Sequence, residues 1–286
     1  STFSQQEVDK IVIPKIKHPN FKKGFGPQIY IDQSHQNFHT KSARFKPFSD
    51  LLKSDGFKVD SLINLKNLNL NAVLVISNAI NTKNIGNWRQ PIYSAFAKEE
   101  ISSLKNWVKR GGRILLIADH MPFAGAANSL ATVFGFTFCD GFAQLKHERR
   151  NEPDVFSLSN SRLISSEITN GSNGQKISSV TTFTGSSFSI PKEATGILKF
   201  NKGDICLQPK VAWQFKETTP QKDLENKYQG AIMNFGKGKI AVFGEAAMFT
   251  AQTVTNNSGV FKVGFHSDNA PSNSNFIRNL MYWLSK

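Results

Sequence analysis

The chain has 286 residues, of which 39% are hydrophobic and 20% are charged, and its formal net charge is +14. This composition excludes a disordered chain, a coiled coil and a collagen-like repeat, because it can build a sizeable core. No apolar run approaches the roughly 18 residues that a membrane-spanning helix requires. Basic residues are scattered or paired, as at Lys22–Lys23, rather than gathered in long runs, which argues against nucleic-acid binding.

The first half of the chain alternates between apolar runs and amphipathic segments. Two of the apolar runs are apolar almost throughout, as parallel strands covered on both faces are. We predict strands at 28–32, 57–60, 72–77 and 113–118, and helices at about 45–55, 98–110 and 125–134. Because strands and helices alternate, this half predicts an α/β fold with a flavodoxin-like, doubly wound, mostly parallel sheet.

The second half of the chain loses this alternation. Residues 141–228 are rich in Ser, Thr, Asn and Gly, with short β-like pieces, and predict a β-rich insertion. A strand at 229–235, a turn at Gly236–Gly238 and a strand at 239–243 follow as a hairpin, and a helix is predicted at 273–285. We therefore expect a single domain over residues 1–286 that contains the insertion.

Polar residues follow three of the predicted strands directly. His35 and His39 follow the first strand, Asp119 and His120 follow the fourth, and Glu245 follows the strand at 239–243. In open parallel sheets, ligands bind outside the carboxyl ends of the strands. The five side chains are therefore expected to converge there, although they lie far apart in the sequence.

This residue set is compatible with more than one kind of site. Histidine with carboxylate is the ligand set of zinc, so His35, His39 and His120 are candidate ligands of a divalent metal that activates water. Glu245 is then the general base, or Asp119 a further ligand. Without a metal, His120 is the best acid–base candidate. The alternative is that these side chains only hydrogen-bond loops and helix ends.

Nucleophilic catalysis has weaker support in the sequence. Ser34, Asp119 and His120 invite a triad interpretation, but adjacent residues on an extended chain point apart and no GxSxG elbow occurs. Cys139 and Cys206 lie in apolar stretches with no adjacent base and are interpreted as core cysteines. Their spacing leaves open whether they pair.

Four stretches, 26–40, 112–120, 238–249 and 275–284, resemble DUF4350-type domains of the class I glutamine-amidotransferase-like superfamily. This resemblance implies a flavodoxin-like sandwich. In true amidotransferases a cysteine nucleophile follows a central strand and works with a downstream His–Glu pair. Here the corresponding strand end is Ala118–His120, and Phe243 stands where that histidine would precede Glu245. The resemblance therefore implies the fold without glutaminase activity.

The main functional hypothesis is a hydrolase-type enzyme of unknown substrate, with His120, Asp119 and Glu245 as catalytic residues. The alternative is a non-catalytic protein that binds a small molecule or a carbohydrate. The sequence begins at Ser1 without an initiator Met or signal peptide, as a mature secreted form or a trimmed chain does, and we expect a periplasmic or secreted location. Nothing in the sequence indicates the oligomeric state.

Overall fold

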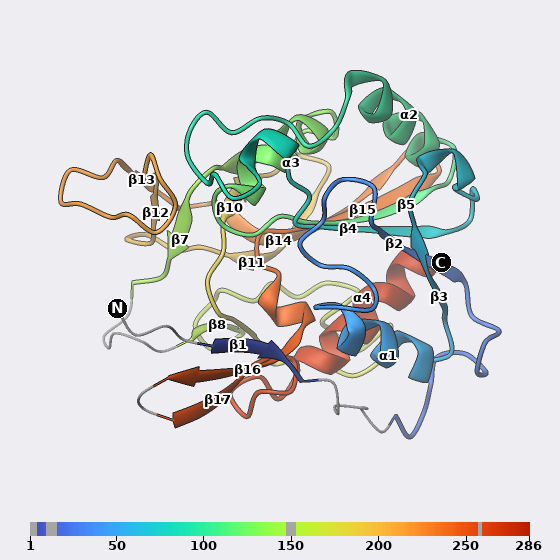
Figure 1. Ribbon diagram of the computed structural model, residues 1–286. Coiled ribbons are helices and arrows are strands. Elements are labelled where there is room, and N and C mark those ends of the chain that lie inside the picture. The colour runs from blue at the N-terminus through green and yellow to red at the C-terminus, as the bar shows by residue number, and fades with distance from the viewer. Residues whose placement is uncertain (1–4, 10–15, 147–152, 257–258) are drawn as a thin grey trace.

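A nine-stranded sheet forms the centre of the computed structural model, which describes residues 5–9, 16–146, 153–256 and 259–286 (Figure 1). The strand order is β3-β2-β4-β5-β15-β14-β10-β6, and β11 also pairs with β14. In that order, the strands are β3 (Lys58–Leu62), β2 (Gln28–Asp32), β4 (Val73–Ser77), β5 (Arg113–Ile117), β15 (Gly238–Phe243), β14 (Tyr228–Phe235), β10 (Ser187–Ser189) and β6 (Thr137–Cys139), with β11 at Thr195–Lys199.

Helices cover both faces of this sheet, because successive side chains of a strand point to opposite faces. In the fully buried β4, Val73 and Val75 belong to the apolar cluster that includes α1 and α4, whereas Leu74 and Ile76 belong to the cluster with α2 and α3. Figure 1 shows the two helix pairs on opposite sides. The helices are α1 (Lys46–Ser54), α2 (Lys98–Lys109), α3 (Phe123–Thr132) and α4 (Asn273–Ser285), with short 3₁₀ turns η1 (Leu65–Asn67), η2 (Thr82–Asn84) and η3 (Ala247–Phe249).

The prediction of a flavodoxin-like, doubly wound, mostly parallel sheet is wrong. Only the half of the sheet built from β3, β2, β4, β5 and β15 is parallel. The other half is antiparallel, since β14 pairs in this way with β15, β10 and β11, and β10 with β6. The predicted hairpin places β14 antiparallel to β15, and β6, β10 and β11, from residues 137–199, extend the sheet in the same antiparallel manner. The prediction failed because it treated this region as an insertion outside the main sheet.

The elements of the parallel half were predicted within a few residues. Helix α2 begins where the Glu100 carboxylate accepts a hydrogen bond of 2.8 Å from the Ala97 amide. The hairpin turn before β15 was also predicted, and Gly236 adopts a φ of +61° there. A Cβ atom on Gly236 would lie 2.5 Å from the Lys109 carbonyl oxygen, so this turn needs glycine.

Three smaller sheets, all antiparallel, surround the central one. Residues 141–228 supply every strand of two of them and also supply β10 and β11 to the central sheet. Among the described residues, no helix is both long and apolar enough to cross a membrane. The small sheets are β1 (Gln5–Val8) with β16 (Ala251–Asn256) and β17 (Gly259–Gly264); β7 (Phe142–Gln144) with β12 (Ile205–Leu207) and β13 (Gln221–Asp223); and β8 (Asp154–Ser157) with β9 (Ser179–Thr182).

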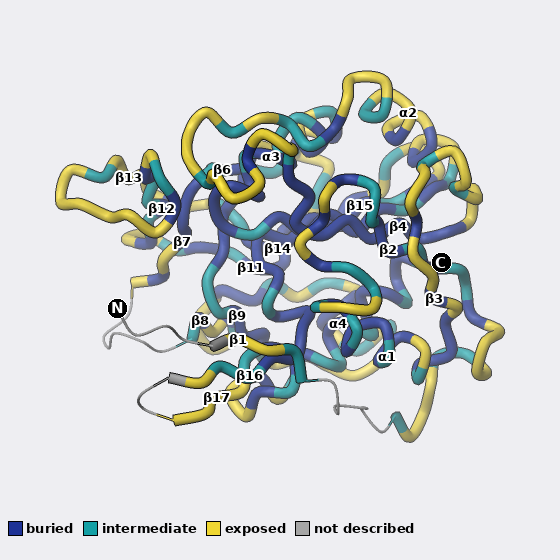
Figure 2. The backbone as a smooth tube through the Cα atoms, viewed as in Figure 1, coloured by how far each residue is buried: buried dark blue, intermediate teal, exposed yellow. Residues whose placement is uncertain are grey.

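A disulfide joins two of these sheets. Cys139 ends the edge strand β6 of the central sheet, and Cys206 lies in the middle of β12. The bond closes a separation of 67 residues. It therefore fixes the β7-β12-β13 sheet, and the exposed loop between β12 and β13, to the central sheet (Figure 2).

Reduction of this disulfide is expected to destabilise the protein. A crosslink over a loop of this length restricts the unfolded chain, and its loss costs about 4 kcal/mol. A reducing agent should therefore lower the urea midpoint of the wild-type protein. The Cys139→Ser/Cys206→Ser double variant serves as the control, because it should match the reduced protein and ignore the reducing agent. An unchanged midpoint on reduction would contradict this expectation.

Candidate functional site

Two neighbouring parallel strands bring carboxylates to the same edge of the central sheet. β5 and β15 pair with Ile117 opposite Phe243, and the Ala118 amide donates to the Phe243 carbonyl oxygen over 2.9 Å. Asp119 and Glu245 each follow that last pair by two residues. The register therefore makes these two carboxylates neighbours as they leave the sheet.

A cavity of about 580 Å³ opens at these strand ends. Its lining includes His39, Asp119, His120 and Glu245, which are four of the five side chains that we expected to converge. His35 is not among the residues that line it.

Glu245 is buried and held by the backbone. Its two carboxylate oxygens accept hydrogen bonds of 2.8 Å from the Ala247 amide and 2.7 Å from the Met248 amide, at the start of η3. Burial and the nearby charge of Asp119 raise the pKa of Glu245 well above its usual value, even though these hydrogen bonds act to lower it. Glu245 therefore keeps a proton to higher pH than an exposed glutamate does.

Asp119 is positioned by the end of the adjacent strand β4. The backbone amide of Asp119 donates to Asn78 Oδ1 over 2.9 Å, and the Asn78 amide donates to the Ile117 carbonyl oxygen over the same distance. Asn78 has a φ of 45°, a left-handed conformation that asparagine tolerates better than most residues. Asp119 Oδ1 in turn accepts from the His120 amide at 2.8 Å. The end of β4 thus fixes the backbone of Asp119, and the His120 amide orients its carboxylate.

The ring of His120 lies among aromatic side chains. It stacks on Phe142, with ring centroids 4.7 Å apart, and meets the edge of Trp213 at 4.6 Å. Its Nδ1 lies 2.7 Å from the Met121 carbonyl oxygen. Because a carbonyl only accepts hydrogen bonds, Nδ1 carries a proton, and Nε2 of the neutral ring is left as an acceptor.

His39 lies at the inner wall of the cavity. Its Nδ1 is 3.1 Å from the Ser77 hydroxyl, and its ring stacks on Phe45 at 4.8 Å. Complete burial, with a smaller contribution from the positive charge of Arg44, lowers the pKa of His39 to about 3. His39 is therefore neutral at physiological pH.

His35 belongs to a different, buried cluster. Its Nδ1 lies 2.7 Å from Asp32 Oδ2, its Nε2 lies 3.5 Å from Glu100 Oε1, and its ring contacts Phe96 at 4.5 Å. Burial alone would lower the pKa of His35, but the hydrogen bond and charge of Asp32, with Glu100, raise it above its usual value. This cluster ties β2 to α2.

The three predicted metal ligands are not brought together as a set. His39 and His120 line the cavity, whereas His35 pairs with Asp32 outside it. Within the described part of the chain, no group of three or more His, Cys, Asp or Glu side chains is arranged to hold a metal ion. A zinc site therefore stays a prediction, and no step proposed below relies on it.

The sequence analysis missed the aromatic walls of the cavity. Trp88 and Phe123 approach each other to 5.3 Å, and Phe38 lies 5.6 Å from Phe123. Trp213 stands at the cavity with 53% of its surface exposed and a φ of 66°. Apart from Phe123, which begins α3, these residues lie in loops, so no periodicity marks them. The only available signal was that tryptophan is unusual in polar loops.

The sheet of β1, β16 and β17 closes another side of the same cavity. It contributes Gln6 from β1, Gln252 from β16 and Phe261 from β17. Arg44 lies over the Phe38 ring at 4.3 Å and donates to Gln252 Oε1 at 3.4 Å. The cavity thus combines aromatic faces with amides and charges of both signs.

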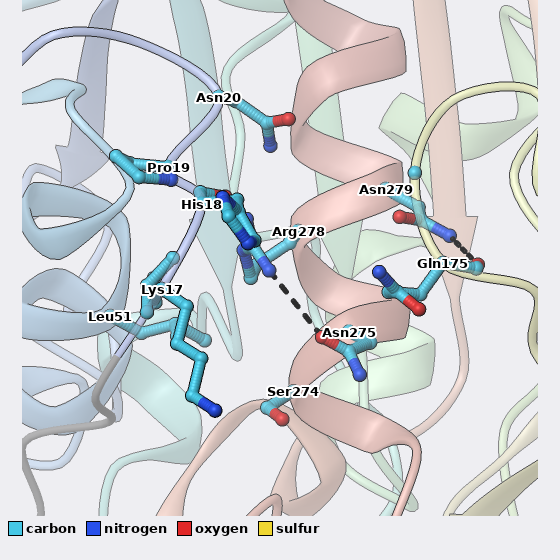
Figure 3. A pocket seen from close by; sticks show the side chains of 12 residues that line it. Lys17, His18, Pro19, Asn20, Leu51, Gln175, Ser274, Asn275, Arg278 and Asn279 are labelled. Atoms are coloured by element: carbon cyan, nitrogen blue, oxygen red, sulfur yellow. Dashed lines mark hydrogen bonds between the residues drawn. The ribbon is translucent and has the colours of Figure 1, made fainter.

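A second cavity, of about 610 Å³, lies between residues 16–20 and α4 (Figure 3). Its most buried cation is Arg278, which donates to Asp55 Oδ1 at 2.9 Å and to the His18 carbonyl oxygen at 2.6 Å. This cation is therefore already neutralised and fastens the N-terminal segment to α4. None of the side chains predicted as functional lines this cavity.

Comparison with known proteins shows a shared fold. No protein-family model matches this chain, and no curated protein matches its sequence. Among solved structures, the mmIFT52 N-terminal domain aligns with a TM-score of 0.60 at 16% identity, over 90% of this chain and 97% of that one. Cytoplasmic protein STM1381 from Salmonella typhimurium LT2 aligns with a TM-score of 0.50 at 12% identity, over 91% and 100%. At these identities the likeness concerns the fold alone.

A β-galactosidase from Bacillus circulans sp. alkalophilus also aligns, at 7% identity, over 89% of this chain but only 30% of that enzyme. Its TM-score of 0.42 is too low to support any functional conclusion.

Acid is expected to destabilise the protein through His39. Between pH 6.5 and about 3 the unfolded chain binds a proton at this residue that the folded chain does not, so stability falls as pH falls through this window. At pH 5 this difference in proton binding lowers the free energy of unfolding by about 2 kcal/mol. His39→Gln should flatten the pH dependence of the free energy of unfolding, whatever its constant cost.

The exposed His18 provides a matched control. His18→Gln should leave the slope of the wild-type curve unchanged, and urea titrations between pH 4 and 7 measure both. Equal slopes for His39→Gln and the wild type would refute the assignment.

Proposed function

We propose that this protein binds a carbohydrate in the cavity at the carboxyl ends of β5 and β15. A sugar ring presents a patch of C–H groups on its face and hydroxyls around its rim. The first requires flat aromatic surfaces, and the second requires carboxylate and amide partners. The cavity offers both, with Trp88 and Trp213 as rings and Asp119, Asn78 and Asn269 as polar partners.

One observation carries this proposal, namely the conformation and exposure of Trp213. A φ of 66° is unfavourable for a bulky residue and costs on the order of 1–3 kcal/mol. The indole remains 53% exposed, so burial of its surface does not account for this cost. Edge contacts with His120 and Phe142 at 4.6 Å hold the ring in place. Such a ring is a preformed platform for a ligand.

The setting of the cysteines agrees with a binding role rather than glutaminase chemistry. Cys139 and Cys206, the two cysteines of the chain, are joined in the disulfide, so neither supplies a free thiol nucleophile. A disulfide also favours an oxidising compartment, which supports the secreted or periplasmic location. Membership of the DUF4350-type domains stays a prediction that the comparisons do not address.

A second candidate function, hydrolysis of a glycosidic bond in the same cavity, is favoured by the carboxyl pair. The raised pKa of Glu245 beside Asp119 allows Glu245 to give its proton to the leaving oxygen. Asp119 then takes a proton from the water that attacks the sugar carbon. One C–O bond breaks, another forms, and the two protons end on the leaving hydroxyl and on Asp119.

Removal of the Trp213 ring tests the binding proposal. Trp213→Ala should weaken the binding of an oligosaccharide by at least tenfold, or about 1.4 kcal/mol, without lowering the melting temperature. Phe25→Ala is the matched control, since this ring is 74% exposed and does not line the cavity. Calorimetric titration against a panel of neutral oligosaccharides measures both. If none binds, or if both variants bind like the wild type, the proposal fails.

Neutralising Asp119 tests the hydrolytic candidate. Asp119→Asn preserves the hydrogen bond from the His120 amide but removes the base, so release of reducing ends should fall at least 100-fold. Asp140→Asn is the control, because Asp140 is a half-buried carboxyl that accepts from the Gly125 amide and does not line the cavity. A wild-type protein that binds but does not cleave, or an Asp119→Asn variant that still cleaves, would reject hydrolysis and leave binding alone.

A further inference from the structure

A basic groove adjoins the proposed carbohydrate site. It has a volume of about 550 Å³, and its lining includes Arg89, Lys210 and Lys216 together with the hydroxyl-bearing Thr218 and Thr219. Among the described residues no carboxylate lines this groove, and none is found within salt-bridge distance of these three cations. The groove therefore presents unneutralised positive charge in a concave surface.

Two acidic side chains, Glu217 and Asp140, come close to the groove in the sequence or in space without lining it. Glu217 follows Lys216 in the sequence but does not line the groove. Asp140 does not line the groove either, and its Oδ2 accepts a hydrogen bond of 3.4 Å from Gln90 Nε2. Three cations with hydroxyl groups beside them are a setting for carboxylate or sulfate groups, which accept charge-assisted hydrogen bonds.

The groove and the cavity share one wall. The segments 88–90 and 210–212 pair antiparallel through Arg89 and Val211, with hydrogen bonds of 2.9 Å from the Gln90 amide and 2.8 Å from the Ala212 amide. In the first segment Trp88 lines the cavity, whereas the next two residues, Arg89 and Gln90, line the groove. Consecutive Cα atoms lie about 3.8 Å apart, so the groove begins within one residue of the aromatic wall.

The β12–β13 loop continues this arrangement. Trp213 lines the cavity, and the next residue, Gln214, lines the groove. The loop is exposed at one end of the molecule, and a turn in which the Lys216 amide donates to Thr219 Oγ1 at 2.8 Å shapes it (Figure 2). Trp213 and Gln214 are therefore a second place where the cavity and the groove adjoin within one residue.

We propose that the carbohydrate of this site is an acidic polysaccharide, whose carboxylate or sulfate groups bind Arg89, Lys210 and Lys216 while a neighbouring sugar ring stacks on Trp213. This inference rests on the proposed binding function. An acidic polysaccharide would use both the aromatic cavity wall and the cationic groove, which adjoin at Trp88–Arg89 and at Trp213–Gln214. The net charge of +14 adds a general attraction for anions, so the experiment must separate the groove from the total charge.

A triple variant with a matched control makes this separation. Arg89→Gln/Lys210→Gln/Lys216→Gln removes three charges from the groove. Lys105→Gln/Lys109→Gln/Arg110→Gln removes three charges from exposed positions on and just after α2, which line neither the cavity nor the groove. Titrations use uronate oligosaccharides, sulfated oligosaccharides and neutral oligosaccharides of equal length, with a single-stranded oligodeoxynucleotide as a general polyanion.

The wild type is expected to bind an acidic oligosaccharide at least tenfold tighter than a neutral one in low salt. The groove variant should lose this preference while its affinity for the neutral chain stays within twofold, and the control variant should retain it. Salt at 1 M, where charges are screened beyond about 3 Å, should remove the preference in the wild type. The uronate and sulfate arms show which acidic group is preferred.

Three results would overturn the inference. Equal binding of acidic and neutral chains, with binding of both lost in Trp213→Ala, would keep the proposed function and reject the acidic ligand. Equal losses in the two triple variants, or oligodeoxynucleotide binding as tight as that of the acidic sugar, would reduce the effect to net charge. The absence of any oligosaccharide binding would reject the proposed function and this inference together.

Discussion

The register between β5 and β15 is the constraint on which the candidate site depends. Each strand is buried on both faces, and their pairing is continuous from Lys239 opposite Arg113 to Phe243 opposite Ile117. A shift by one residue would move every core side chain to the wrong face. The apolar core thus fixes the position of Asp119 beside Glu245, although neither residue contributes to it. The carboxyl pair is placed by forces unrelated to its chemistry.

The sequence was informative where burial imposes a period. The strands at Val73–Ser77 and Arg113–Ile117 and the helix at Lys98–Lys109 were predicted because two-sided or one-sided burial leaves a repeating pattern. The strand ends were informative for a related reason, since a polar residue directly after a buried strand stands out. Hence the sequence predicts that His39, Asp119, His120 and Glu245 converge at the strand ends, and all four line the cavity there.

The remaining features depend on contacts that no local pattern encodes. The antiparallel half of the sheet uses strands such as Ser187–Ser189, too short to show an alternation. His35 resembled His39 in the sequence, but Asp32 three residues earlier captures its ring. Trp88 and Trp213 meet the cavity only because two loops pair across a separation of more than a hundred residues. Tertiary pairing of this kind has to be observed.

The two buried histidines near the N-terminus have opposite electrostatic surroundings, and together they give the fold an optimum pH. The cluster of His35 with Asp32 and Glu100 strengthens as pH falls toward 6.5, and its contribution is then complete. Below 6.5 the neutral, enclosed ring of His39 becomes a growing liability. Each residue alone would give a stability curve that rises in one direction only. The sum of these two contributions is therefore most favourable near pH 6.5, so two rings only four residues apart oppose each other's response to pH.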